Sequence, residues 1–168
     1  PFKNKLSLIS IGESKLKNTP IMTASMPLYN RNREIFGSII LLINPDNHFN
    51  DLLLKERLGN TGETYAFNSD AILISESRFN SQIYNIGIIP KPKQSKLHVS
   101  IRNPGINLLE GLANLEELKS RPLTLMAKNA TKGFSGSNLK GYLDYRGINV
   151  IGAWLWDKNL NLGIATEM

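Results

Sequence analysis

Two runs of apolar residues stand near the start of the chain, at residues 21–29 and 36–43, with a polar segment between them. This pattern predicts two strands joined as a hairpin with a rather long loop. The second run is apolar at nearly every position, whereas a strand with one solvated face would alternate. We therefore expect this strand to be covered on both faces or to lie centrally in a sheet.

Residues 44–59 carry the signals of a helix of about three turns. Asn44 can cap the first turn, and Pro45 suits the first helical position because an N–H group would be unpaired there anyway. Leu52 and Leu53 belong to an apolar set at helical spacing, which predicts one buried face.

The middle of the chain has weaker patterns. Residues 64–77 alternate around an Asn-Ser-Asp turn and predict a second hairpin. A short helix is expected at residues 79–86 and a strand at residues 96–102. The leucine-rich segment 106–119 suits irregular helix better than strand.

A capped helix is expected at residues 120–133, with Ser120 as its cap and Gly133 as its terminator. The end of the chain then predicts a three-stranded meander at residues 140–145, 148–156 and 162–167. A hairpin, intervening helices and a meander together predict an α+β fold, in which one antiparallel sheet is flanked by helices.

The chain of 168 residues is long enough for one domain, or for one domain and part of a second. Its formal net charge of +6 raises the question of a nucleic-acid partner. The basic residues are scattered, however, and the short groups at 31–33 and 91–93 lack the aromatic neighbours that would stack on bases. We therefore expect a solvated basic surface and no nucleic-acid partner. A surface facing anionic lipid headgroups stays open.

Enzymatic motifs are weak in this sequence. It has no cysteine, and neither His48 nor His98 has a second ligand at metal-binding spacing, so no metal or other cofactor is expected. Residues 133–137 (GFSGS) nearly copy a nucleophile elbow, but they lack its last glycine and follow a predicted helix instead of a strand. A small hydrolase using Ser135 or Ser137 is kept only as an alternative to a non-catalytic domain.

Two separated segments carry a family resemblance, TGETYAFNSD at residues 61–70 and YRGINVIGAW at residues 145–154. Together with IRNPG and PLTLMA between them, they resemble the membrane-proximal lobe of double Cache sensor domains. Those are PAS-like extracytoplasmic ligand-binding modules of bacterial chemoreceptors, histidine kinases, cyclases and serine/threonine kinases. The resemblance covers most of residues 58–168. It departs at Ala71, where glycine is common in the family, because alanine tolerates a positive φ poorly.

The resemblance implies a division of the chain. Residues 1–45 resemble the C-terminal hairpin of a truncated membrane-distal lobe, residues 46–60 the connecting helix, and residues 61–168 the membrane-proximal PAS-like Cache lobe. It also implies a periplasmic or extracellular receptor part, tethered to the membrane through flanking helices and homodimeric in the full receptor. In such sensors the distal lobe is often the one that binds ligand.

A ligand pocket on the concave side of the sheet would explain the aromatic residues. Arg78 follows a strand end, where its guanidinium could grip a carboxylate with two parallel hydrogen bonds. Asp144 could hold an amine, so the two together would suit an amino acid or another small organic acid. The expected ligand-binding residues are Tyr65, Phe67, Arg78, Tyr142, Asp144 and Trp154.

Structural alternatives stay open for the same residues. The aromatic side chains could form the core, and Arg78 could lie on the surface or pair with Asp144 as a clasp. The lobe would then be a ligand-free spacer and dimer interface, recognisable by packed aromatics without a cavity.

Overall fold

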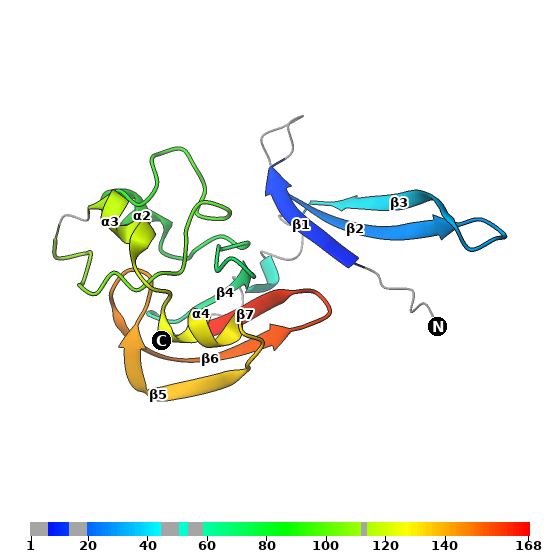
Figure 1. The fold of residues 1–168 in the computed structure, drawn as a ribbon. Coiled ribbons are helices and arrows are strands. Elements are labelled where there is room, and N and C mark those ends of the chain that lie inside the picture. The colour runs from blue at the N-terminus through cyan, green and yellow to red at the C-terminus, as the bar shows by residue number, and fades with distance from the viewer. Residues whose placement is uncertain (1–6, 14–19, 45–50, 54–58, 112–113) are drawn as a thin grey trace.

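The computed structural model describes residues 7–13, 20–44, 51–53, 59–111 and 114–168. These residues form two antiparallel sheets, and Figure 1 shows the first sheet projecting away from the second. None of the described helices is long and apolar enough to cross a lipid bilayer.

The first sheet contains, in spatial order, β1 (Ser7–Glu13), β2 (Pro20–Tyr29) and β3 (Ile35–Ile43). The predicted hairpin is confirmed, because β2 and β3 pair in an antiparallel register. Asn30 shapes the turn between them, since its Oδ1 accepts the main-chain N–H groups of Asn32 and Glu34, each at 2.9 Å. The sequence pattern did not predict β1.

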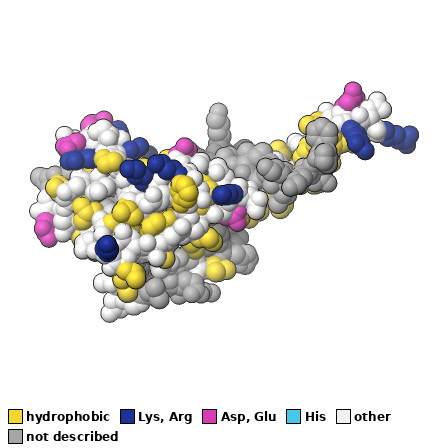
Figure 2. Space-filling model, turned by 60° about the horizontal axis from the view of Figure 1, so that its bottom comes forward, with side chains coloured by type: hydrophobic (Ala, Val, Ile, Leu, Met, Phe, Trp, Pro, Cys, Tyr) yellow, Lys and Arg dark blue, Asp and Glu magenta, His cyan; other side chains and the backbone are white. Residues whose placement is uncertain are grey.

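The expectation that the second apolar run is covered was wrong for this chain. β3 is an edge strand, and side chains on both of its faces are exposed, Ile40 by 60% and Leu41 by 59%. The physical reason is that, among the described elements, β2 is the one against which β3 packs extensively. Figure 2 shows hydrophobic side chains along this projecting hairpin and charged side chains at its tip.

We expect the chain to self-associate through β3, because an exposed apolar edge strand offers unpaired N–H and C=O groups to another chain. Light scattering after size exclusion should show a mass that increases with protein concentration. Replacing both Ile40 and Leu42 with serine should abolish this increase, whereas Leu139→Ser, on the second sheet, should not. A wild-type chain that stays monomeric at every concentration would contradict the expectation.

The structure describes only a small part of the segment in which the connecting helix is predicted. Residues 51–53 are helical, and the remainder of segment 45–58 lies outside the described residues. Leu53 is buried in a small apolar cluster with Ala66 and Ile74. This turn of helix therefore covers part of the outer face of the second sheet.

The second sheet contains, in spatial order, β4 (Glu63–Asn68), β7 (Leu162–Glu167), β6 (Asn149–Asp157) and β5 (Gly136–Leu143). The predicted meander is confirmed, although β5 begins earlier than expected and has an irregularity between Asn138 and Tyr142. β4 joins the meander beside β7, with Tyr65 opposite Ala165. The first strand of the lobe therefore lies next to its last strand.

The strand expected at residues 96–102 does not form. This segment makes only isolated bridges, at Ser100 and Arg102. Leu97 has a positive φ of 64°, and the N–H group of His98 donates back to the carbonyl oxygen of Ser95, so the chain turns instead of extending.

The turn after β4 keeps its left-handed residue even though that residue is alanine. Ala71 has a φ of 57° and is fully buried. The side-chain oxygen of Asn68 accepts the main-chain N–H groups of Asp70 and Ile72, at 3.1 and 2.9 Å, and this holds the turn in place.

Besides the helical turn at residues 51–53, the described residues form three short helices beside the second sheet: α2 (Asn80–Asn85), α3 (Leu115–Ser120) and α4 (Leu125–Ala130). α2 confirms the helix predicted at residues 79–86. The helix expected from Ser120 instead begins at α4, where the Oγ1 of Thr124 accepts the N–H group of Ala127 at 3.3 Å. Pro122 explains the difference, because it keeps Arg121 extended and so separates α3 from α4.

The hydrophobic core lies between the inner face of the second sheet and α2 and α4 (Figure 1). Ile83 of α2 and Met126 of α4 are fully buried in it. The architecture is therefore α+β, an antiparallel sheet flanked by helices, as predicted. The sheet contributes Tyr65, Phe67, Tyr142, Val150, Trp154, Trp156 and Ala165 to this core.

Candidate functional site

The predicted aromatic wall lies on the inner face of the second sheet. Tyr65 and Phe67 are fully buried, with ring centroids 6.2 Å apart. Tyr142 meets Trp154 edge to face at 6.4 Å, and the indole N–H group of Trp154 donates to the carbonyl oxygen of Phe134 at 3.0 Å. These rings pack in one cluster with α4, so they fill the space above the middle of the sheet.

The end of β7 carries a buried carboxyl group that the sequence analysis did not single out. The two oxygens of Glu167 accept hydroxyl hydrogen bonds from Tyr65 and Tyr142, each at 2.8 Å. Burial raises the pKa of Glu167 to about 7, although these hydrogen bonds act in the opposite direction. Gly152 leaves the necessary space, because a Cβ at that position would lie 2.5 Å from the hydroxyl oxygen of Tyr142.

A second buried carboxyl group belongs to Glu63 at the start of β4. Its Oε1 accepts the hydroxyl of Ser77 at 2.6 Å and the main-chain N–H group of Arg78 at 2.7 Å. Its Oε2 accepts the hydroxyl of Tyr145 at 2.8 Å. Burial raises the pKa of Glu63 despite these bonds. The network fastens β4 to the segment before α2 and to the turn between β5 and β6.

Asp144 is held by the chain itself. Its carboxylate accepts two hydrogen bonds from the guanidinium of Arg146, at 2.6 and 2.9 Å, and two more from the main-chain N–H groups of Arg146 and Ile148. Both charged side chains are buried, and the guanidinium lies 3.6 Å from the ring centroid of Phe79. Asp144 therefore forms a clasp, with Arg146 as its partner.

Arg78 does not pair with Asp144, whose ion-pair partner is Arg146. One guanidinium nitrogen of Arg78 donates to the carbonyl oxygens of Gly62 at 2.6 Å and Gly59 at 3.1 Å. The side chain thus closes the loop that leads into β4.

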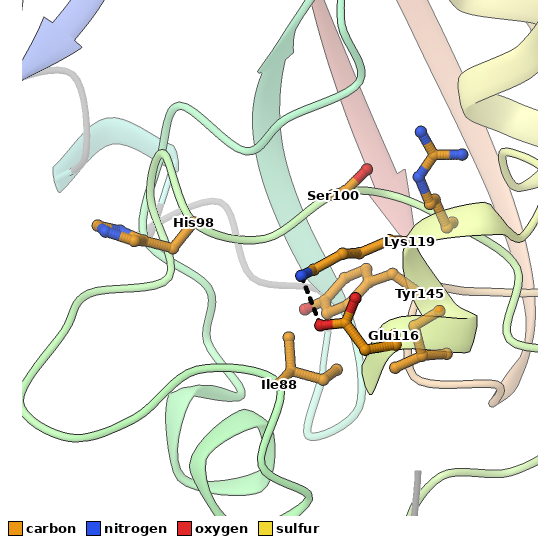
Figure 3. A pocket seen from close by; sticks show the side chains of 8 residues that line it. Ile88, His98, Ser100, Glu116, Lys119 and Tyr145 are labelled. Carbon is orange, nitrogen blue, oxygen red and sulfur yellow. Dashed lines mark hydrogen bonds and ion pairs between the residues drawn. The ribbon is translucent and has the colours of Figure 1, made fainter. Parts of the chain in front are cut away.

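An open cavity of about 480 Å³ lies at the side of this filled inner face. Its walls come from the segment after α2, the irregular segment 98–102, and α3. Figure 3 shows the ion pair of Lys119 with Glu116 among the lining side chains, and His98 lies apart from it across the cavity. The lining residues are Ile88, His98, Ser100, Arg102, Glu116, Leu118, Lys119 and Tyr145.

The cavity combines cationic groups with an apolar surface. Lys119 and Glu116 form an ion pair at 2.8 Å, but their side chains are 73% and 82% exposed, so water screens the pair. Arg102 is half-buried and donates to the carbonyl oxygen of Arg121 at 2.6 Å, which uses one of its five N–H donors. Such walls suit a small ligand that has an anionic end and an apolar body.

Several solved structures that resemble this chain in fold are sensor domains. The extracellular domain of the putative histidine kinase mmHK1S-Z3 matches with a TM-score of 0.58 and 12% identity, over 98% of this chain and 49% of that one. The periplasmic sensory domain of the Campylobacter jejuni chemoreceptor Tlp1 matches with a TM-score of 0.57 and 15% identity, over 98% and 48%. The ligand-binding domain of the Campylobacter jejuni chemoreceptor Tlp3, in complex with 4-methylisoleucine, matches with a TM-score of 0.51 and 14% identity, over 99% and 48%.

This chain shares the fold of these sensor domains. The predicted PAS-like Cache architecture is thereby confirmed at the level of the fold, and the neighbours are sensor domains, not catalytic ones. The chain spans about half the length of the sensor domains it matches. No family model and no curated protein matches the sequence.

Two of the described residues that were considered for catalysis, Ser135 and His98, are held by hydrogen bonds to the main chain. The hydroxyl of Ser135 accepts the main-chain N–H group of Trp156 at 3.0 Å, and it lies between α4 and β5, whereas a nucleophile elbow joins a strand to a helix. The Nδ1 atom of His98 lies 3.0 Å from the carbonyl oxygen of Lys96. His48 lies outside the described residues. The described part of the chain holds no group of three His, Cys, Asp or Glu side chains suited to a metal.

Proposed function

We propose that the chain is part of the extracytoplasmic sensor of a membrane-bound bacterial signalling receptor. Its cavity beside Tyr145 binds a small carboxylate, such as an amino acid or another organic acid. The observation that carries this proposal is the cavity itself, an open space of about 480 Å³ with Arg102 and Lys119 in its wall. Ligand sites usually occupy roughly 300–1,000 Å³. Ligand bound there would shift the lobe between conformations and so pass a signal to a cytoplasmic output domain.

The proposal includes a division of the chain. Residues 1–45 belong to a membrane-distal lobe, residues 46–60 form the connection, and residues 61–168 form the membrane-proximal lobe. The exposed apolar side chains of β3 support this division, because the remainder of a distal lobe would cover them. The sensor is periplasmic or extracellular, is tethered to the membrane through flanking helices, and works as a homodimer in the full receptor.

A thermal-shift screen with amino acids and small carboxylates tests the ligand proposal. A ligand at a hundred times its Kd should add about 2.7 kcal/mol to the free energy of unfolding and so raise the melting temperature. Arg102→Gln should weaken binding roughly tenfold to hundredfold, because a hydrogen bond to a charged group contributes about 1.5–3 kcal/mol. As a control, Arg31→Gln removes an exposed arginine from the hairpin tip and should bind like the wild type.

The ligand-binding role expected for Tyr65, Phe67, Arg78, Tyr142, Asp144 and Trp154 stays a prediction, and the same screen examines it. Arg78→Gln should lower the melting temperature without ligand, because the loop carbonyls lose their donor, but it should leave the ligand-induced shift unchanged. If Arg78→Gln abolishes the shift and Arg102→Gln preserves it, the site lies on the Arg78 side and not in the cavity.

The filled inner face favours one second candidate function, a ligand-free spacer and dimerisation lobe. In that case no compound in the panel raises the melting temperature, and Arg102→Gln behaves like Arg31→Gln. That outcome would remove ligand binding from the proposal and leave the sensor-domain fold unaffected.

A further inference from the structure

The two buried glutamates stand directly opposite each other in the second sheet. The register of β4 and β7 pairs Glu63 with Glu167, and both side chains point to the inner face. Like charges at directly opposite positions destabilise a sheet. Among the described residues, no Lys, Arg or His side chain forms an ion pair with either of them.

The surroundings of Glu167 disfavour a negative charge. Burial and the carboxyl groups of Asp144 and Glu63 raise its pKa, and the hydrogen bonds from the hydroxyls of Tyr65 and Tyr142 offset this only in part. The guanidinium of Arg146, which acts on Glu63, is engaged in an ion pair with Asp144. The titratable groups that act on Glu167 from β4, β5 and the turn between β5 and β6 are Glu63, Tyr65, Tyr142 and Asp144. Tyr145 and Arg146 act in turn on Glu63.

We propose that Glu167 is a proton-binding switch of the sensor lobe. When its carboxyl group is neutral, the end of β7 packs firmly against β4 and β6. When the group is ionised, that attachment weakens. This inference concerns a site separate from the ligand cavity, and it does not depend on whether a ligand binds there.

The position of Glu167 in the sheet makes such a switch effective. It is the last residue of β7, and the register pairs it with Glu63 on one side and Gly152 on the other. A movement that brings its carboxylate to water must therefore open the contacts of β7 with both neighbouring strands.

The sign follows from the pKa of Glu167, which burial raises from the ordinary value of 4.5 to about 7. The folded state then binds this proton more tightly than the unfolded state. The stabilisation from this group is complete below about pH 4.5 and is lost as the pH rises to about 7.

Thermal unfolding of the 168-residue chain between about pH 5 and about pH 8 tests the switch. We expect the melting temperature of the wild type to fall as the pH rises across this range. Glu167→Gln keeps the side-chain length but cannot ionise, so its profile should be flatter. Glu110→Gln, an exposed glutamate bonded only to Asn107, should parallel the wild type.

A second measurement reads the wild-type chain directly. The carbon-13 NMR shift of the Glu167 carboxyl group should titrate with a midpoint of about 7. Parallel pH profiles for the wild type and Glu167→Gln would overturn the proposal, and so would a carboxyl midpoint near 4.5. The NMR titration decides the question even if Glu167→Gln fails to fold.

Discussion

Asp144→Ala is expected to lower the free energy of unfolding by about 3–5 kcal/mol. The substitution leaves the guanidinium of Arg146 buried without its partner, and it also removes the acceptor for the main-chain N–H groups of Arg146 and Ile148. An unpaired buried charge costs more than the loss of an exposed hydrogen bond, since the charge has no access to water. Urea denaturation, with the midpoint and slope measured for both proteins, gives the difference.

Asp157→Ala is the matched control for this experiment. Asp157 also shapes a hairpin turn, where its Oδ1 accepts the N–H groups of Asn159 and Leu160 at 2.8 and 3.0 Å, but these bonds are exposed. Its removal should cost about 1 kcal/mol. If Asp144→Ala unfolds like this control and instead loses a ligand-induced shift, Asp144 is a ligand anchor and the clasp is secondary.

For β6 the sequence predicted both the strand and the face that it buries. In β6, Val150 and Trp154 are buried while Ile151 and Leu155 are exposed, which is the alternation that the pattern implied. The same alternation misled at residues 96–102. There the burial alternates only from His98 to Arg102, and the positive φ at Leu97 breaks the backbone path, so hydrogen bonds to the segment after β4 form without a regular ladder.

The inner face could be predicted from the sequence, but its filling could not. Alternation places Tyr65, Tyr142 and Trp154 on the inside whether the space above them is hollow or packed. The distinction depends on how several side chains fit together, for example the hydroxyl of Tyr142 above Gly152, and no single position in the sequence records that.

The cavity residues escaped sequence analysis for a different reason. Arg102 and Lys119 come from an irregular segment and from α3, neither of which shows a clear hydrophobic period. The available signal was only that basic side chains occur in short irregular segments between the two segments that carry the family resemblance. Tyr145 connects the two regions, because its ring lines the cavity and its hydroxyl bonds to Glu63.

Glu167 was missed even though its place in β7 could be predicted. Its alternation with Ala165 assigns it to the inner face, where a carboxyl group needs partners. Those partners, Tyr65 and Tyr142, lie on two other strands. Their convergence depends on the strand order β4-β7-β6-β5, which the sequence pattern left undetermined.

Gly147→Ala is expected to destabilise the lobe by about 2–5 kcal/mol, the combined cost of a positive φ and of an atom inserted into a packed site. Gly147 has a φ of 79°, and a Cβ there would overlap the carbonyl oxygen of Ile106 and lie 2.7 Å from its carbonyl carbon. Main-chain atoms cannot move aside like a flexible side chain. The affected loop is fixed to this turn, because the N–H group of Leu108 donates to the carbonyl oxygen of Arg146 at 2.9 Å.

Gly87→Ala separates the two causes of this loss. Gly87 has nearly the same φ, 77°, but a Cβ there would meet no atom within 4 Å, so only the backbone cost of about 1–2 kcal/mol applies. Urea denaturation of both variants measures the difference. The loop at Ile106 connects segment 98–102 to α3, so a displaced loop should also reduce ligand-induced stabilisation in Gly147→Ala. Equal losses in the two variants would mean that the loop moves away freely and does not fix the cavity walls.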